Sequence, residues 1–375
     1  MTIGIPRNQG AEKRVPLLPE HLKFFLDLNC KVFIEKSAGE SAFISDDMYR
    51  EAGAEITDIS KINKESDIIL FVDAPSDKAI SKIEKSKILI GTFNPLVNKE
   101  LINKFNSKGL TTFSMDLVPR TSRAQSMDVL SSMASVAGYR AVLDAARMLP
   151  KFFPMFMTAA GTIKPARLLI LGAGVAGLQA VATARKLGAI VEVFDVRSAV
   201  KEEVMSLGGK FIEVEGATED KDAGGYAVEQ TEDFKKRQAQ MIQEHAIKAD
   251  VIICTAQIPG KKAPVLIKEE SVAGMKPGSV IIDLAASSGG NCEVTKNGEI
   301  SSFKGVVIVG ESNYPSSMPS DSSKMYGTNL INFLKLLIKD DGTLNLNFDD
   351  DIIKGTCLTY NGELLNERVK SILKI

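Results

Sequence analysis

A short stretch from Arg120 to Ser132, R-T-S-R-A-Q-S-M-D-V-L-S-S, concentrates side chains that form hydrogen bonds. The groups best suited to contact a polar ligand belong to Arg120, Gln125, Asp128 and Ser131. The stretch contains no His, Cys or Lys, so its chemistry suits orienting a ligand better than shuttling a proton. The competing interpretation is an ordinary helix start, capped by Ser122 or Ser126, with Arg120 and Arg123 solvated. The residues alone favour neither interpretation.

A second candidate site is the segment L-G-A-G-V-A-G-L, which follows an apolar run and opens a helical pattern. Gly172 allows a tight turn, Gly174 lets the backbone approach a pyrophosphate, and Gly177 lets the helix pack against the preceding strand. The alternative is a plain turn, which the complete strand–turn–helix–strand pattern disfavours. The pattern therefore predicts a dinucleotide site formed by Gly172, Ala173, Gly174, Val175, Ala176, Gly177, Asp195, Val196 and Arg197.

The charges beyond the glycines bear on which dinucleotide binds. Asp195 ends the next apolar run, close to the offset of about 20 residues at which a carboxylate holds the ribose hydroxyls. A carboxylate repels a 2′-phosphate, which favours NAD over NADP. Arg197 lies two residues further on, and arginine is the usual partner of such a phosphate, so this residue favours NADP instead.

The elements that position these groups come in two alternating series. Apolar, β-branched runs separated by helical patterns predict parallel strands with crossover helices, first up to about residue 115 and again from residue 167. Between them, Ser126 to Leu149 predicts one long helix, which Pro150 ends. We expect two Rossmann-like, doubly wound α/β domains with mainly parallel sheets, the second inserted into the first. Their expected extents are 1–127 with 315–375, and 128–314.

Composition excludes several classes of protein. A chain of 375 residues predicts two domains, and 46 basic against 47 acidic residues give no electrostatic argument for nucleic acid. The four cysteines are scattered without metal-ligand spacing, so we expect neither a zinc site nor a disulfide framework. No apolar run reaches the roughly 20 residues of a membrane span, and the N-terminus lacks the pattern of a signal peptide.

The scarcity of proton shuttles limits the redox chemistry. An ordinary dehydrogenase needs a base near the reacting carbon, whereas hydride transfer between two nicotinamides moves no proton there. The chain has only His21 and His245, each in a predicted helix away from strand ends, where we expect structural roles.

Several motifs together resemble a known family. R-A-Q-S-M-D-V-L-S-S, A-G-Y-R-A-V, M-T-A-A-G-T, G-V-A-G-L-Q-A, S-L-G-G-K-F and M-K-P-G-S-V-I-I-D-L-A are similar to the NAD(H)-binding alpha subunit (domain I) of proton-translocating NAD(P) transhydrogenases. The glycine triplet alone would also match alanine dehydrogenase, a relative of the same architecture.

The resemblance implies a function and a set of partners. NAD(H) would bind at the second domain, and hydride would pass between it and NADP(H) held on a partner domain III, coupled to proton translocation by a membrane domain II. The chain would form a homodimer in the cytoplasm, peripheral on the inner face of the membrane through its partners. The family's nicotinamide contacts fall on Arg120, Gln125, Asp128 and Ser131, with Gln125 also facing NADP(H). Further nucleotide contacts fall on Gly225 and Tyr226 of a mobile loop, on Gln238 and on Gln257.

The resemblance leaves two alternatives. An alanine dehydrogenase-like amino-acid oxidoreductase would need the Lys and His of that relative, but Ala74 and Asn94 lie in the corresponding regions. Arg14 resembles that relative's substrate-binding arginine, although we expect it at the surface or bridging the domains. The other alternative is a non-catalytic NAD-sensing module. Gln257 stands where the family pattern suggests an apolar residue, so it is expected to alter an adenosine contact.

Overall fold

The computed structural model describes residues 1–214, 231–258 and 260–374. Its contacts divide the chain into two units, one formed by Met1–Met133 with Pro315–Ile375 and the other by Ala134–Tyr314. The chain passes from the first unit into the second within α6 (Val129–Met148). The second unit is thus inserted into the first, which confirms the expected fold class. The boundaries expected at 127/128 and 314/315 stay a prediction.

The first unit is built on an eight-stranded sheet. Its strand order is β17-β16-β6-β5-β4-β1-β2-β3, and the six strands from β6 to β3 are parallel. Because the order reverses between β1 and β4, this is a doubly wound sheet, with β16 and β17 added antiparallel at one edge. The strands are β1 (Thr2–Ile5), β2 (Lys31–Glu35), β3 (Glu55–Thr57), β4 (Ile68–Asp73), β5 (Ile88–Thr92), β6 (Thr111–Ser114), β16 (Cys357–Tyr360) and β17 (Glu363–Leu364).

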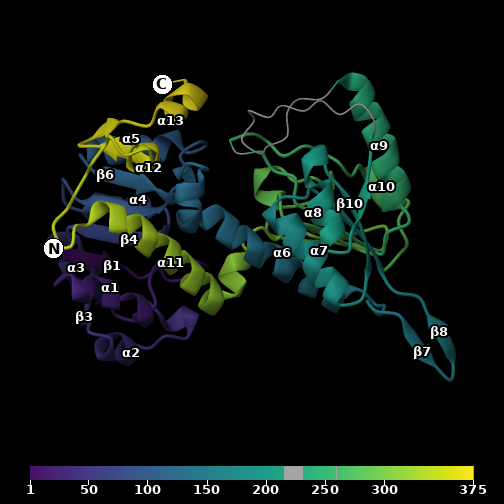
Figure 1. Cartoon of the computed structure of the whole chain (residues 1–375), viewed down its shortest axis with the longest axis horizontal. Helices are drawn as coiled ribbons and strands as arrows, with labels where there is room; N and C mark the ends of the chain where they lie inside the picture. Colours follow the sequence, from purple (N-terminus) through teal and green to yellow (C-terminus); the bar gives the residue numbers. More distant parts are fainter. Residues whose placement is uncertain (215–230, 259, 375) are drawn as a thin grey trace. The chain divides into compact units, whose positions relative to one another are not determined.

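Helices cover both faces of this sheet (Figure 1). Successive side chains of a strand point to opposite faces, so neighbouring residues of one strand belong to different cores. On one face, Ile68 and Leu70 join a core with residues of α1, α11 and α12. On the other, Ile69 and Phe71 pack with α3, α4 and α5. The helices are α1 (Lys23–Asp27), α2 (Asp46–Glu51), α3 (Ile59–Glu65), α4 (Asp77–Lys82), α5 (Lys99–Ser107), α11 (Pro319–Leu337), α12 (Asp351–Thr356) and α13 (Glu367–Leu373), with 3-10 helices η1 (Pro19–His21), η2 (Glu40–Ala42), η3 (Met115–Leu117) and η4 (Ser122–Met127).

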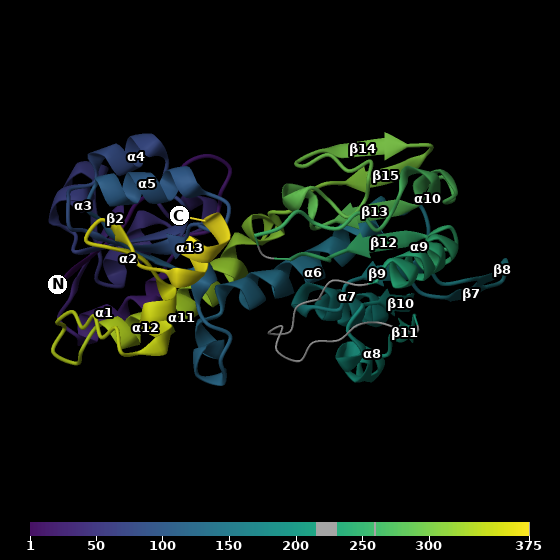
Figure 2. The same ribbon diagram turned by 90° about the horizontal axis from the view of Figure 1, so that it is seen from above.

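The second unit repeats the same winding. Its sheet has the order β11-β10-β9-β12-β13-β15-β14, parallel except for β14, and Figure 2 shows these strands in sequence across the unit. The order reverses between β9 and β12, which is where ligands of such sheets bind. The strands are β9 (Arg167–Leu171), β10 (Ile190–Phe194), β11 (Lys210–Ile212), β12 (Val251–Cys254), β13 (Val280–Asp283), β14 (Ile300–Phe303) and β15 (Val306–Val309).

Two helical layers enclose this second sheet. Residues of α6, α7 and α8 pack with Leu168 and Ile170 of β9, while α9 and α10 pack with Leu169 and Leu171 of the same strand. The helices are α7 (Val175–Lys186), α8 (Lys201–Ser206), α9 (Glu232–Ala246) and α10 (Glu269–Ala273), with η5 (Ser198–Val200) and η6 (Ala286–Ser288). No helix in the described ranges combines the length and apolar character needed to cross a membrane.

Two features differ from the sequence-based expectations. The long helix begins at Val129 rather than Ser126, because the residues before it form the 3-10 helix η4. After Pro150 the chain forms a hairpin that the sequence did not predict, with β7 (Phe156–Thr158) and β8 (Gly161–Ile163) paired antiparallel. Figure 1 shows the hairpin extending from the body of its unit, and its strands are exposed throughout.

Candidate functional site

The glycine turn lies at the carboxyl end of β9, and each glycine has a distinct steric reason. Gly172 has φ of +103°, a left-handed conformation that side chains disfavour. A Cβ at Gly177 would lie 1.9 Å from the Gly172 carbonyl oxygen, so only glycine allows α7 to approach the strand end. A Cβ at Gly174 would meet nothing within 4 Å, which leaves the backbone open on that side. This geometry fits the role expected of the triplet.

The start of α7 provides a place for an anion. Gly174 is the N-cap residue, and as a glycine it has no side chain with which to accept from the first free N–H groups of the helix. Those N–H groups and the helix dipole favour a diphosphate at this end. Because Gly174 also leaves open space, the chain's residues fit a dinucleotide diphosphate here.

Asp195 follows β10 and is held against the glycine turn. Its Oδ2 accepts a hydrogen bond from the Ala173 N–H at 2.7 Å, and its side chain is 7% exposed. The Arg197 guanidinium donates to both carboxylate oxygens, at 2.9 Å to Oδ1 and 2.7 Å to Oδ2. This hydrogen-bonded pair raises the pKa of Arg197. Asp195 is therefore oriented toward the turn, and ribose hydroxyls would compete with Arg197 for its oxygens.

The other predicted nucleotide contacts are placed as follows. Val175 is exposed, Ala173 is buried, and Ala176 and Val196 are partly buried against the cores of their unit. Gln238 is half-buried on α9. The Gln257 amide donates to the Leu284 carbonyl at 2.8 Å, so this side chain is already engaged. Gly225 and Tyr226 lie outside the described residues.

Sequence reasoning missed Thr255, which bonds the glycine turn, and Asn291, which holds the residue after Thr255. Thr255 follows β12, and its hydroxyl donates to the Gly172 carbonyl at 3.0 Å. The Asn291 side chain bonds both the N–H and the carbonyl of Ala256, at 3.0 and 2.9 Å. The backbone N–H of Asn291 in turn donates to the buried carboxylate of Asp283 at 2.9 Å. No motif marks these residues, because the neighbourhood of β9 and β12 follows only from the strand order.

The polar stretch from Arg120 forms η4 followed by the first turn of α6. Asp128 accepts from the Ser131 N–H at 2.9 Å and from the Ser131 hydroxyl at 2.6 Å, which is the pattern of a helix N-cap. The cap is therefore Asp128, and not Ser122 or Ser126 as the competing interpretation of this stretch had it. Gln125 and Arg120 are exposed, while Asp128 and Ser131 are half-buried. The roles of these four side chains toward a ligand stay a prediction.

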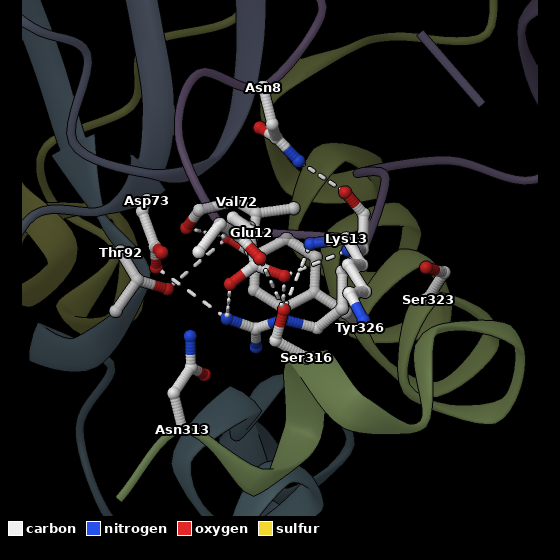
Figure 3. A network of polar contacts seen from close by, with 12 residues as sticks. Asn8, Glu12, Lys13, Val72, Asp73, Thr92, Asn313, Ser316, Ser323 and Tyr326 are labelled. Atoms are coloured by element: carbon white, nitrogen blue, oxygen red, sulfur yellow. Dashed lines mark hydrogen bonds and ion pairs between the residues drawn. The ribbon is translucent and has the colours of Figure 1, made fainter. Parts of the chain in front are cut away.

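Arg14 is buried within a polar cluster, so of the two positions expected for it the surface one is wrong, while the domain-bridging one stays a prediction. Arg14 is 6% exposed, and its guanidinium donates to both Glu12 oxygens, at 2.8 and 2.7 Å. Asp73, at the end of β4, lies 3.6 Å from the same guanidinium. Tyr326 donates to the Phe71 and Val72 carbonyls at 3.0 and 3.1 Å. Figure 3 shows Glu12, Asp73 and Tyr326 converging in this cluster, at the reversal point of the first sheet.

The two histidines make structural contacts. His21 accepts at Nδ1 from the Leu18 N–H at 3.0 Å, and burial lowers the pKa of its imidazole. His245 Nδ1 lies 2.8 Å from Glu192 Oε2. Burial acts to raise the pKa of the Glu192 carboxyl, but the hydrogen bond and the charge of His245 outweigh it, so this pKa is lowered. Among the described residues, no cluster of three or more His, Cys, Asp or Glu could hold a metal ion.

Known proteins resemble this chain over nearly its whole length. The family model for the alanine dehydrogenase/PNT N-terminal domain matches residues 4–137, and that for the C-terminal domain matches residues 141–367. An NAD(P) transhydrogenase alpha-subunit polypeptide from Rhodospirillum rubrum is 44% identical over 376 residues, which covers 98% of each chain.

Solved structures agree with this assignment. A transhydrogenase from Sinorhizobium meliloti has a TM-score of 0.89 and 42% identity, covering 97% of this chain and 100% of that one. An L-alanine dehydrogenase, at a TM-score of 0.82 and 22% identity, covers 100% of this chain and 99% of its own and shares the fold. The chain therefore belongs to the alanine dehydrogenase/PNT family, among the NAD(P) transhydrogenase alpha subunits that its motifs predicted.

Proposed function

We propose that this chain binds NAD(H) at the glycine turn of the second unit and exchanges hydride with NADP(H) held on a partner domain. The observation that carries the proposal is the exposed Gln125 in a polar segment without His, Cys or Lys. A nicotinamide, when bound, supplies the hydride itself. The residues then have to orient a ring and exclude water, tasks that suit amide, guanidinium and carboxylate groups.

The proposed roles divide between the candidate residues. The N–H groups at the start of α7 would hold the diphosphate, and Asp195 would hold the adenosine ribose, which favours NAD(H). Arg120, Asp128 and Ser131 would orient the carboxamide and ribose beside the reacting ring. Gln125 would lie between this ring and the incoming NADP(H). Gly225 and Tyr226 would close over the bound nucleotide, and Gln238 and Gln257 would contact it.

The proposal includes an assembly. The chain would act with a membrane domain II and an NADP(H)-binding domain III, and the hydride transfer would be coupled to proton translocation. It would lie in the cytoplasm, peripheral on the inner face of the membrane through these partners. It would form a homodimer, and the apolar residues of the β7–β8 hairpin support this, since Met157 is 77% exposed.

The structure disfavours alanine dehydrogenase chemistry at the first sheet. The Arg14 guanidinium is already hydrogen-bonded to Glu12 and lies beside Asp73, so a substrate carboxylate would have to displace both negative groups. Asp73 ends β4, and Ala74 follows it in the region where the resemblance places a Lys of alanine dehydrogenase, so that proton-transferring side chain is replaced here by an alanine.

The test is to mix the purified chain with an NADP(H)-binding transhydrogenase domain, NADPH and an oxidised NAD analogue. We expect reduction of the analogue, measured by absorbance. In a separate mixture of the purified chain with NADH, pyruvate and ammonia, we expect no oxidation of NADH. NADH oxidation that depends on pyruvate and ammonia would establish the amino-acid oxidoreductase instead. Nucleotide binding without hydride transfer in either assay would establish a sensing module.

A further inference from the structure

The segment that carries Gln125 is a 3-10 helix, η4, which its own hydrogen bonds stabilise only weakly. η4 runs over six residues, Ser122–Met127, whereas 3-10 helices rarely exceed three or four because their hydrogen bonds are poorly aligned. Two of its residues are anchored in the core, since Ala124 is 1% exposed and Met127 is 6% exposed. The exposed Gln125 lies between these anchors, and the rest of the segment must be held by contacts from elsewhere in the unit.

One such contact comes from the start of α12. The Arg123 guanidinium donates to both oxygens of Asp350, at 2.7 Å from Nη1 and 2.8 Å from Nη2, and it also contacts Asp351. Asp350 is the N-cap of α12 and accepts from the Ile352 N–H at 2.8 Å. One carboxylate thus starts a helix and fixes the arginine, and this two-pronged geometry restricts the guanidinium more than a single hydrogen bond would.

A second contact comes from α11, which packs against η4. Asn329 is 7% exposed and donates from Nδ2 to the Ser126 carbonyl at 2.8 Å. Asn332, one turn further along the same face of α11, donates to the same oxygen at 3.2 Å. The residues directly before and after Gln125 in the fold are therefore tied: Ala124 and Arg123 on one side, Ser126 and Met127 on the other.

We propose that Arg123 and Asn329 are positioning residues that set the place of Gln125 for hydride transfer. The inference rests on the proposed function, because Gln125 matters only if a second ring approaches it. Neither residue belongs to the nucleotide turn, so their loss should change the rate of transfer and leave nucleotide affinity in place. A displacement of the order of 1 Å costs on the order of a hundredfold in such geometry-dependent reactions.

The test compares Arg123→Gln and Asn329→Leu with the unaltered chain, each mixed with an NADP(H)-binding transhydrogenase domain. Single-turnover reduction of an oxidised NAD analogue by NADPH gives the rate, and NADH fluorescence gives the dissociation constant. We expect roughly ten- to a hundredfold slower transfer with a dissociation constant within about twofold. Hydrogen exchange should become faster in residues 122–127. Arg50→Gln is the matched control, since Arg50 is an exposed arginine with a local partner, Asp47, in the same unit.

A Gln125→Ala background separates positioning from general stabilisation. If Arg123 acts through Gln125, adding Arg123→Gln to Gln125→Ala costs little further rate, because the two changes are not additive. Unchanged rates in the single variants, an undiminished effect in the Gln125→Ala background, or a parallel loss of affinity and melting temperature each overturn the inference. A wild-type chain that transfers no hydride with a competent partner overturns the proposed function and this inference together.

Discussion

At the scale of single residues, Asp128 combines a local structural task with a proposed functional one. Its carboxylate accepts from both the N–H and the hydroxyl of Ser131, so it caps α6 and orients the serine at once. Asparagine would keep one acceptor for the N–H but would lose the charge and the second acceptor. The effects on stability and on ring placement can therefore be separated.

We predict that Gln125→Asn and Asp128→Asn slow hydride transfer by about ten- to a hundredfold while NADH affinity is largely retained, because both residues act on ring placement. Stopped-flow reduction of an NAD analogue and NADH titration measure the two quantities. Asp58→Asn is the control, since Asp58 caps α3 in the same unit and its Oδ1 accepts from the Lys61 backbone N–H at 2.9 Å. Rates equal to the wild type in both variants would refute the assigned roles.

His21 predicts a pH dependence of stability. Burial, with a further contribution from Lys324, lowers the pKa of the folded-state imidazole below its ordinary 6.5, whereas Glu20 acts in the opposite direction. The unfolded chain therefore binds the proton more readily than the folded one. The stability that the folded state gains from keeping His21 neutral is present above pH 6.5 and is lost as pH falls toward the lowered pKa.

Chemical denaturation at pH 7.5 and 5.5 tests this prediction. The free energy of unfolding should decrease between the two values, and it should decrease less in His21→Gln, which cannot titrate there. Identical pH dependence in the two proteins would show that His21 does not contribute.

At the scale of elements, the turn between β9 and α7 separates two uses of glycine. Gly177 is required for packing, since its Cβ would lie 1.9 Å from a backbone carbonyl that cannot rotate away. Gly174 has an ordinary φ of −76° and open space around it, so alanine fits the fold there. Only a ligand approaching the backbone would meet the added methyl group.

We predict that Gly177→Ala destabilises the protein by about 1–3 kcal/mol or more, as overpacking does. Gly174→Ala should change stability little but weaken NADH binding at least tenfold. Denaturant titration and fluorescence binding measure both effects. A Gly174→Ala protein with wild-type affinity would place the diphosphate elsewhere.

At the scale of the whole molecule, the exposed hairpin predicts the oligomeric state. Met157 is 77% exposed on β7, and Phe156 and Ile163 on the paired strands are each 40% exposed. A ribbon of apolar side chains in water is costly unless another surface covers it, which supports the proposed homodimer.

Met157→Asp should therefore shift the protein toward a monomer by desolvating a charge in the interface. Light scattering during size-exclusion chromatography measures the mass. Val97→Asp, at an apolar residue that is 67% exposed in the first unit, is the control and should leave the mass unchanged. A dimer of undiminished stability in Met157→Asp would exclude the hairpin as the interface.

The sequence predicted the fold class well because apolar runs and helical patterns alternate along the chain. Short apolar, β-branched runs located the parallel strands, such as Ile68–Asp73 and Val251–Cys254, to within one or two residues, and both strands are buried almost throughout. Helix starts were less accurate: the pattern from Ser126 continues smoothly into α6, and only the backbone shows that η4 precedes Asp128. The hairpin was missed because Phe156 and Met157 read as an apolar run next to prolines, without a turn signature of its own.

By itself, the sequence determined what depends on neighbours along the chain: the glycine turn from Gly172 to Gly177, the acid that follows β10, and the family to which the motifs belong. Tertiary structure alone decided that Thr255 meets Gly172, that Glu12 and Asp73 surround Arg14, and that Asp350 holds Arg123. The physical reason is that hydrophobic periodicity specifies which face of an element is buried but not which element lies beside it. Strand order and the return of the chain at Pro315 supply that second kind of information.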